Sequence, residues 1–314
     1  MNIFITGGFG YLGQRIGEYF HSSGAKIYVG SRTKRNKPLW LINGECIHTN
    51  WDDIYSSIKN IQNIDLVIHS AGMNSTDSFN NPEMAINFQG MTTKKLIDAC
   101  IKRDINKFIF LSTAHVYSSP LEGTISEDSV LKNSHPYASS NAIGEKHVVE
   151  ADISGKINSK VLRISNCFGP PLDINTNCWH LIVNDICLQL IKNNSIKLLS
   201  DGTQLRDFIP ISEFCRALDF IIKNCMNDRS QNIFNIGGKT FSINDITDIV
   251  VKTYKKKYKK SIKLVKSEPS IKKEIEPLVY QMNWTKKHNF KKIFNPYSEI
   301  EKLLDFCYKN KEFL

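Results

Sequence analysis

The segment Ile3-Phe4-Ile5-Thr6-Gly7-Gly8-Phe9-Gly10-Tyr11-Leu12-Gly13 decides the fold of this chain. A short apolar strand runs into glycines at the spacing G-x-x-G-x-x-G, and a helical pattern begins there. Glycines permit a tight turn, and they let a pyrophosphate approach the backbone at the N-terminus of the following helix. The alternative is that they only turn a strand into a helix. The segment therefore predicts a dinucleotide contact at Gly7, Gly10, Tyr11, Leu12 and Gly13.

The first half of the chain alternates apolar runs with helical patterns. The apolar runs cover residues 3–6, 26–30, 66–70 and 107–112, and the helical patterns cover residues 12–22 and 87–103. A helix at 136–152 and a strand at 160–164 continue the series. This alternation is typical of an α/β protein with a doubly wound parallel sheet and helices on both faces.

The alternation weakens after Phe168, where glycine and proline follow. We therefore predict a Rossmann domain over residues 1–168, to which residues 213–237 return. A smaller C-terminal α/β substrate lobe would cover residues 169–212 and 238–314.

The composition is that of an ordinary globular protein, with 314 residues of which 41% are hydrophobic and 23% charged. No apolar run approaches the roughly 20 residues that a membrane helix needs, and the chain begins with a strand-like segment rather than a signal peptide. We expect a cytoplasmic protein. The eight cysteines are scattered without a C-x-x-C pair, which indicates reduced, mostly buried side chains and no metal site.

The formal net charge is +10, and the lysines concentrate between Lys252 and Lys273. Such a charge is compatible with nucleic acid, but no nucleic-acid-binding motif accompanies it. We interpret the run as a solvated face of a C-terminal helix that also attracts an anionic small substrate. We expect neither a nucleic-acid nor a membrane partner.

The stretch from Pro136 to Glu145 contains Tyr137 and Asn141, which would share one face of a helix because they are four residues apart. It resembles the catalytic Tyr-x-x-x-Lys helix of short-chain dehydrogenases/reductases, with asparagine in place of lysine. In that family the lysine anchors the nicotinamide ribose and lowers the tyrosine pKa. Asn141 can bind a ribose hydroxyl but carries no charge, and Lys146 falls on the opposite helix face.

Three further segments select a subgroup of that family. Residues 163–170 resemble the signature R-x-x-N-x-(Y/F)-G-P, residues 201–209 resemble G-x-x-x-R-D-F, and residues 235–238 resemble the closing N-(I/V)-G turn. Their order and spacing resemble the extended, NAD-dependent epimerase/dehydratase family, whose members modify nucleotide sugars. The resemblance implies substrate contacts at Asn166 and at Arg206, whose forked donors suit a diphosphate.

The residues after the second strand indicate the cofactor preference. An NAD site usually presents Asp or Glu to the adenosine ribose at this position. This chain has Ser31-Arg32-Thr33-Lys34-Arg35 there, which favours NADP(H) over NAD(H) unless Arg32 and Arg35 are solvated loop charges. The resemblance places further cofactor contacts at Asn50, Trp51, Ser70, Ala71, Gly72 and Asn87, in addition to Tyr137 and Asn141. Trp51 could equally be a core residue.

The resemblance also assigns the catalytic hydroxyl to Thr113, with Ser112 as the fallback, beside Tyr137 and Asn141. Family dehydratases carry Asp-Glu after this threonine, whereas this chain has Ala114-His115 and so lacks that acid and base pair. His115 and His180 match the proton-transfer positions of a family epimerase-reductase. Alternatively, His115 only binds the substrate, and His180 only faces solvent.

Three functions follow from these assignments. The first is NADP(H)-dependent reduction of a 4-keto (deoxy)sugar nucleotide for surface polysaccharide precursors, with Tyr137 as proton donor and with 3/5-epimerisation by His115 and His180 as an extension. The second is a nucleotide-sugar 4-epimerase of the UDP-galactose type that holds NAD. The third is a non-catalytic nucleotide-sugar binder, which Asn141 motivates. The resemblance implies a homodimer formed through the helices at 87–103 and 137–152.

Overall fold

The computed structural model describes residues 1–267 and 276–314, so Lys272 and Lys273 of the predicted lysine-rich run lie outside the described residues. The chain divides into two compact units. Unit 1 comprises Met1–Ser119, Glu127–Ile164 and Leu218–Asn235, and unit 2 comprises Pro120–Ser126, Ser165–Ala217 and Ile236–Leu314. Residues 120–126 and 165–168 of the predicted first domain group with unit 2, and residues 166–168 form a strand in its sheet. Of the predicted returning segment 213–237, only residues 218–235 group with unit 1.

Unit 1 is built on a seven-stranded sheet with the order β11-β7-β5-β4-β1-β2-β3. Its strands are β1 (Asn2–Thr6), β2 (Lys26–Ser31), β3 (Gly44–His48), β4 (Leu66–His69), β5 (Lys107–Thr113), β7 (Asn158–Ile164) and β11 (Ile233–Ile236). All neighbours from β3 to β7 pair in parallel. The order reverses at β1, so the carboxyl ends of β1 and β4 form the crevice where such sheets bind ligands. The predicted doubly wound Rossmann sheet is confirmed.

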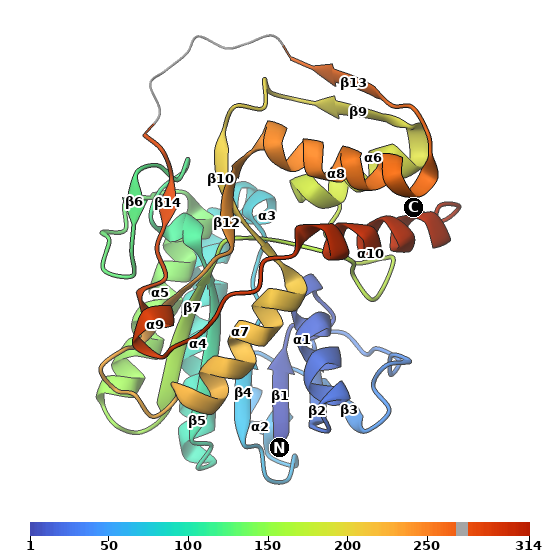
Figure 1. Ribbon diagram of the computed structural model, residues 1–314. Helices are drawn as coiled ribbons and strands as arrows, with labels where there is room; N and C mark the ends of the chain where they lie inside the picture. The colour runs from blue at the N-terminus through green and yellow to red at the C-terminus, as the bar shows by residue number, and fades with distance from the viewer. Residues whose placement is uncertain (268–275) are drawn as a thin grey trace. The chain divides into compact units, whose positions relative to one another are not determined.

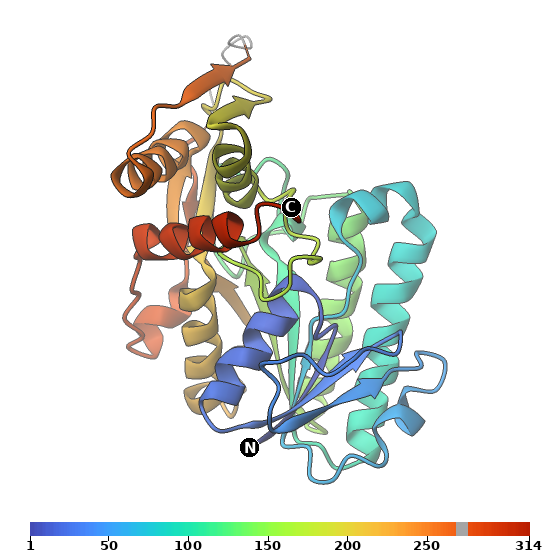
Figure 2. The ribbon, with the colours of Figure 1, turned by 90° about the vertical axis from the view of Figure 1, so that its right-hand side faces the viewer.

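Helices cover both faces of this sheet (Figure 2). They are α1 (Tyr11–Ser22), α2 (Ile54–Ile58), α3 (Ser75–Asn80), α4 (Pro82–Lys102) and α5 (Pro136–Ile153), and a 3₁₀ turn, η1 (Ala114–Val116), follows β5. Leu96 of α4 and Val148 of α5 are fully buried with Phe108 and Phe110 of β5 in one apolar core. Helix α4 begins five residues before the predicted start, because Pro82 suits the first turn of a helix.

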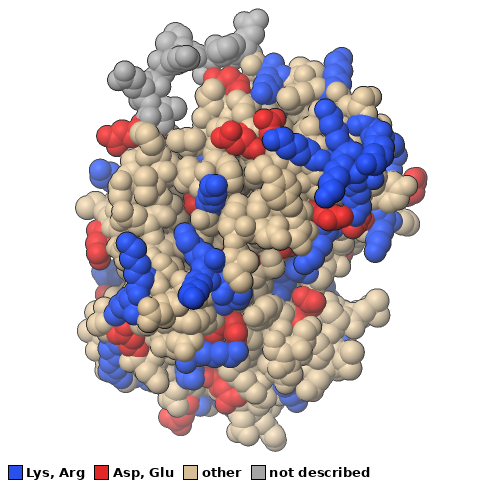
Figure 3. Space-filling view, in the orientation of Figure 1, with Lys and Arg blue, Asp and Glu red and all other residues tan. Residues whose placement is uncertain are grey.

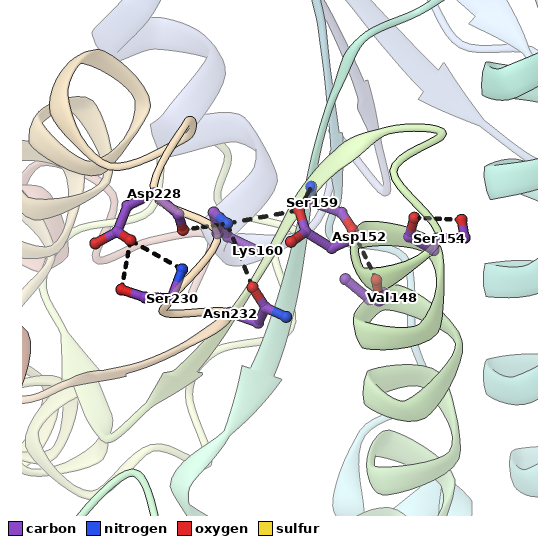
Figure 4. Close-up of polar contacts among 9 residues, drawn as sticks. Val148, Asp152, Ser154, Ser159, Lys160, Asp228, Ser230 and Asn232 are labelled. Carbon is purple, nitrogen blue, oxygen red and sulfur yellow. Dashed lines mark hydrogen bonds and ion pairs between the residues drawn. The ribbon is translucent and has the colours of Figure 1, made fainter.

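A buried lysine fastens the returning segment Leu218–Asn235 to the sheet (Figure 4). Lys160 of β7 is fully buried. Its ammonium donates to the carbonyl of Asp228 at 3.0 Å and lies 3.5 Å from the carboxylate of Asp152 in α5. Because a buried ammonium needs such partners, this contact holds the approach to β11 beside β7.

Unit 2 contains three small sheets and a helical layer. A three-stranded sheet has the order β12-β10-β8, and two-stranded sheets pair β13 with β9 and β14 with β6. The strands are β6 (Thr124–Ile125), β8 (Asn166–Phe168), β9 (Ser195–Leu198), β10 (Leu205–Pro210), β12 (Lys239–Ser242), β13 (Lys263–Lys266) and β14 (Val279–Tyr280). The helices are α6 (Ile182–Asn193), α8 (Ile243–Tyr258), α9 (Asn283–Lys287) and α10 (Pro296–Lys309), and α7 (Ile211–Asn224) is shared with unit 1 (Figure 1).

The core of unit 2 lies where α6, α8 and α10 meet its strands. Leu190, Val250 and Leu303 are fully buried there with Phe208 of β10. All eight cysteines of the chain are free, and all except Cys46 are buried. Among residues 1–267 and 276–314, no helix has both the length and the apolarity needed to cross a membrane.

Candidate active site

The loop after β1 is as tight as its glycines predict. Gly7 adopts φ +62°, and a Cβ placed on it would lie 2.7 Å from the Cα of Ala71. A Cβ on Gly13 would lie 2.3 Å from the carbonyl oxygen of Gly7, so α1 packs directly onto the loop. The first turn of α1 holds no acidic side chain. This helix N-terminus can therefore approach an anion closely.

A cavity of about 310 Å³ opens beside this loop, within the range of small-molecule sites. Its walls belong to unit 1 and come from the ends of several strands and from α3 and α4. The lining residues are Gly7, Phe9, Gly10, Gly30, Ser31, Arg32, Thr33, Arg35, Thr49, Trp51, Ser70, Ala71, Gly72, Met73, Asp77 and Phe88. The structure thus brings together nine of the predicted cofactor residues: Gly7, Gly10, Ser31, Arg32, Arg35, Trp51, Ser70, Ala71 and Gly72.

Other predicted cofactor residues lie outside this wall. Tyr11, Leu12 and Gly13 belong to the first turn of α1. Asn50 and Asn87 are exposed, and the side chain of Asn50 accepts the backbone N–H of Asp52 at 3.0 Å. Their cofactor contacts stay predictions.

Two side chains of the cavity wall, Phe88 and Asp77, were not predicted from the sequence. Phe88 follows the predicted Asn87 by one residue, and its ring lies 5.6 Å from the ring of Trp51. Asp77 accepts a 2.8 Å hydrogen bond from the side chain of Asn74 at the start of α3. An Asn-x-x-Asp pair before a helical pattern is a capping signal, but it carries no indication of a cavity.

The two predicted arginines lie against aromatic rings of this wall. The Arg32 guanidinium is 5.8 Å from the ring centre of Phe88, and that of Arg35 is 5.7 Å from the ring centre of Phe9. Stacking of this kind orients a guanidinium without neutralising it. Asp77 is the one acid among the lining residues that the structure describes. The cavity wall therefore carries excess positive charge.

Thr113 and Tyr137 meet at the carboxyl end of β5. Thr113 is the last residue of β5, and Tyr137 lies in the first turn of α5, where His135 accepts its backbone N–H at 3.2 Å. Burial raises the pKa of Tyr137, while a hydrogen bond with Thr113 lowers it in part. No charged side chain of the described residues adds to this balance. The Tyr137 phenol therefore keeps its proton at neutral pH.

Asn141 lies one turn after Tyr137 and is 5% exposed. Its amide donates to the carbonyl of Tyr137 at 2.7 Å, so it bonds back to its own helix. Lys146 is 73% exposed and pairs with Glu150 at 3.9 Å, as its predicted place on the outer face requires. Neither residue brings a positive charge to the Tyr137 phenol.

A buried ionic network explains why Thr113 rather than Ser112 faces Tyr137. The hydroxyl of Ser112 donates to the carboxylate of Glu145 at 2.5 Å, which commits Ser112 to the interior. Glu145 also accepts from Arg163 at 2.7 Å, and Arg163 donates to the hydroxyl of Tyr117 at 2.7 Å. The network joins β5, α5 and β7 through Ser112, the residue that precedes Thr113.

The predicted substrate residues divide between the units. His115 belongs to unit 1, and its carbonyl accepts from the side chain of Asn133 at 2.7 Å. Asn166, His180 and Arg206 belong to unit 2. His180 is exposed, with its Nδ1 3.2 Å from the side-chain oxygen of Asn177. The joint action of His115 and His180 stays a prediction.

Arg206 of β10 is half-buried, and burial lowers its pKa. No carboxylate of the described residues raises it in return. Neighbouring Asp207 faces the other way: its carboxylate accepts the backbone N–H of Gly238 at 2.9 Å, and burial raises its pKa to about 6. The side chain of Asn166 donates to the Asp207 carbonyl at 2.8 Å. Unit 2 thus presents a guanidinium that can accept an external anion.

A doubly wound parallel sheet with a tight glycine loop and a positively charged cavity beside it is typical of α/β proteins that bind dinucleotides. The model of the NAD dependent epimerase/dehydratase family matches residues 3–237, and the chain belongs to this family. The predicted resemblance is confirmed at the level of the family.

Known relatives fall among nucleotide-sugar enzymes. The UDP-glucose 4-epimerase of Halalkalibacterium halodurans is 23% identical over 266 residues, covering 79% of each chain. The structure of UDP-glucose 4-epimerase with UDP-glucose from Thermotoga maritima is similar with a TM-score of 0.82 at 18% identity, covering 99% of this chain and 100% of that one. The UDP-glucose 4-epimerase of Thermus thermophilus in complex with NAD has a TM-score of 0.80 at 18% identity, covering 98% of each.

Proposed function

We propose that this protein reduces a 4-keto (deoxy)sugar nucleotide with NADPH. The observation that carries the proposal is the Tyr137 phenol, whose pKa is raised by burial, hydrogen-bonded to Thr113 and with the uncharged Asn141 one turn away. Reduction of a ketone requires a proton donor at the carbonyl oxygen, and a neutral phenol is such a donor. Oxidation of an alcohol requires the tyrosinate instead, which a neighbouring cation would have to stabilise.

The residues of unit 1 fit a dinucleotide cofactor. The glycine loop leaves no room for a Cβ where a pyrophosphate would approach, and the cavity lies beside it. Arg32 and Arg35 would hold a 2′-phosphate. Asp77 is the one acidic residue of the described cavity wall that would oppose this negative charge. This excess positive charge supports NADP(H) over NAD(H).

The bound cofactor would supply the hydride, and the chain would supply positioning and the proton. Thr113 would donate a hydrogen bond to the 4-keto oxygen. Tyr137 would transfer its proton to the same oxygen as the ketone becomes an alcohol, and solvent would return that proton to the phenol. In unit 2, Arg206 would bind the diphosphate of the substrate and Asn166 would also contact the substrate. Proton exchange at the carbons beside the ketone by His115 and His180 is an extension of this proposal.

A 4-epimerase is the second candidate, because the relatives include UDP-glucose 4-epimerases, one of them in complex with NAD. Such an enzyme would hold NAD and return the hydride to the other face of the sugar. Its first step is an oxidation, for which Asn141 supplies no cation. A non-catalytic binder ranks third, since Thr113, Tyr137 and Arg206 are all retained.

The cofactor test is to denature the purified protein and identify any released nucleotide. NADP, or an empty site that binds NADPH more tightly than NADH, is the expected result. Stoichiometric NAD would instead indicate internal hydride recycling and favour the epimerase.

The catalytic test follows NADPH absorbance with a nucleoside diphosphate 4-keto-6-deoxyhexose as substrate. The Tyr137→Phe variant should lose roughly 10²- to 10⁴-fold in turnover, the usual contribution of a positioned acid. Tyr55→Phe, on a partly buried tyrosine of α2, is the matched control and should retain activity. Full activity in Tyr137→Phe would rule out the proton transfer that we assign.

We also propose a homodimer through α4 and α5. Met84 and Met91 of α4 are 59% and 53% exposed, and Ile153 of α5 is 73% exposed, which is unusual for side chains this apolar. Analytical ultracentrifugation should show a dimer, and Met84→Glu with Met91→Glu should convert it to a monomer. A wild-type monomer at high protein concentration would contradict this proposal.

A further inference from the structure

The lysine-rich segment has no part in the proposed reaction. Residues 252–267 contain eight lysines and no acidic residue, which accounts for most of the formal net charge of +10. Figure 3 shows the lysine side chains gathered over the region of α8. The sequence predicts a solvated surface here that also attracts an anionic small substrate, and the structure adds a hollow to this surface.

A second cavity, of about 380 Å³, lies between α8 and α10 within unit 2. Its lining residues are Lys252, Thr253, Lys256 and Lys257 of α8 and Tyr297 and Glu301 of α10. No residue is shared with the wall of the cofactor cavity, and Arg206 does not line it. The volume falls within the range of small-molecule sites, so this hollow is large enough for a ligand rather than a single ion.

The charges of this second cavity are only partly compensated. Lys257 pairs with Glu301 at 3.1 Å and with Asp305 at 2.8 Å. The ion pairs of the described residues include neither Lys252 nor Lys256. These two lysines lie four residues apart on α8, so their stems project from one helix face about 6 Å apart. Two uncompensated ammonium groups at that spacing complement one dianionic group.

The opposite wall consists of Tyr297 and of Glu301, whose carboxylate is paired with Lys257. Tyr297 lies in the first turn of α10, lines the cavity and is 51% exposed. A half-exposed ring can cover a flat or apolar group of a ligand, and it adds nothing for a bare inorganic ion. The cavity therefore joins a dianion site to an apolar surface.

We propose that the cavity between α8 and α10 binds a small phosphate ester, with its phosphate at Lys252 and Lys256 and its ring or apolar group against Tyr297. This site is separate from the cofactor cavity and from Arg206. A membrane surface or a nucleic acid would instead use all the lysines of residues 252–267 alike, because such partners respond to the summed charge.

The test titrates the full-length protein with phenyl phosphate and with inorganic phosphate, followed by NMR at low salt. Saturating NADPH fills the cofactor cavity. Phenyl phosphate should bind more tightly than inorganic phosphate, and Lys252→Ala with Lys256→Ala should weaken it at least about tenfold. Lys255→Ala with Lys260→Ala is the matched control, since it removes the same charge from the same segment outside the cavity wall.

Two further variants make the result specific. Tyr297→Ala should abolish the preference for phenyl phosphate over inorganic phosphate while both still bind. Arg206→Ala should leave phenyl phosphate binding unchanged. This variant separates the cavity between α8 and α10 from the proposed substrate contact at Arg206, so one proposal can fail without the other. Equal losses in the two lysine pairs would indicate a diffuse polyanion surface and overturn the proposal, as would absence of binding at millimolar ligand.

Discussion

The side-chain amide of Asn141 donates a 2.7 Å hydrogen bond to the main-chain carbonyl of Tyr137, one turn earlier on α5. The position that carries a lysine in the family motif is thus filled by a neutral group that is satisfied within its own helix. Burial is then the largest influence on the Tyr137 phenol, and it raises the pKa. Such a phenol is suited to donate a proton rather than to accept one, as the proposed reduction requires.

Replacing Asn141 by lysine should move the pH dependence of reduction. A lysine one turn from Tyr137 favours the tyrosinate, so the alkaline limb of kcat/KM should shift to lower pH. Activity at high pH should fall, while any alcohol oxidation by the same site should improve. The measurement is the pH profile of NADPH consumption for wild type, Asn141→Lys and the neutral control Asn141→Ala. An identical alkaline limb in all three proteins would show that the residue at position 141 does not influence the ionisation of Tyr137.

Removing Arg32 and Arg35 from the wall of the cavity beside the glycine loop should erase the proposed preference for NADP(H). Arg32→Ala with Arg35→Ala should weaken NADPH binding by about tenfold or more, the usual effect of losing charge-assisted hydrogen bonds, and should leave NADH binding nearly unchanged. Lys34→Ala is the control, because Lys34 lies between them in the sequence but does not line the cavity. Fluorescence titration with both nucleotides measures this. Equal losses for NADH and NADPH would show that the arginines act on the shared part of the cofactor.

Breaking the ion pair of Glu145 and Arg163 should be costly. Both side chains are 4% exposed, so Arg163→Met would leave an unpaired buried carboxylate and lower the free energy of unfolding by about 3–5 kcal/mol. Glu145→Leu combined with Arg163→Met should recover much of that loss, since no buried charge is left alone. Denaturant unfolding measures both variants.

The control for that prediction is the exposed pair Lys94 and Asp98 on α4, at 2.8 Å. Lys94→Ala should cost less than about 1 kcal/mol. A similarly small loss of unfolding free energy in Arg163→Met would mean that water reaches and solvates the Glu145 carboxylate.

Acid should destabilise unit 1 through His69. The ring is fully buried between the hydroxyls of Thr6 at 2.6 Å and Thr93 at 3.2 Å, and burial lowers its pKa from 6.5 to about 3. The Thr93 hydroxyl donates its hydrogen bond to the carbonyl of Gln89, so it can only accept one from the ring. Nε2 of the neutral ring therefore carries the hydrogen and donates to Thr93, and Nδ1 accepts a hydrogen bond from the Thr6 hydroxyl. Below pH 6.5 the unfolded chain takes up a proton that the folded chain excludes. The unfolding free energy should therefore fall by up to about 1.4 kcal/mol per pH unit.

The measurement is the difference in unfolding free energy between wild type and His69→Gln from pH 7 to pH 4.5, which should shrink as pH falls. The difference is needed because Asp207, whose folded pKa is about 6 against an ordinary 3.8, acts with the opposite sign in the same window. His180→Gln, at an exposed histidine, is the control for loss of a histidine elsewhere in the chain. A flat difference for His69→Gln would mean that the folded state protonates this ring.

Much of the site could be predicted from local sequence. The glycine spacing predicted the loop before α1, because Gly7 requires a positive φ and Gly13 has no room for a side chain. The arginine pair after β2 predicted the charge of the cavity wall. Tyr137 and Asn141 were predicted to share a helix face, because the period of an α-helix fixes that relation.

Other features depended on contacts between distant segments. Phe88 of α4 and Asp77 of α3 line the cavity beside the glycine loop, although nothing in the local sequence indicates that either residue reaches it. Ser112 and Thr113 both carry a hydroxyl, so their chemistry alone could not decide which of them faces Tyr137. In the structure, the Ser112 hydroxyl is bonded to Glu145, 33 residues further along the chain, and is therefore directed into the interior.

The sequence by itself determined the family, the alternation of strands and helices in the first half of the chain, and the residue types available for chemistry. Spacing and local backbone preference encode these features, and both are properties of neighbouring residues. Only the tertiary structure decided which cations are compensated and which hydroxyls are free to react. Burial and ion pairing depend on segments that are distant in the sequence and pack together in the fold, such as α8 with α10 or β5 with α5. This packing determines how far each pKa shifts and which lysines have no acidic partner.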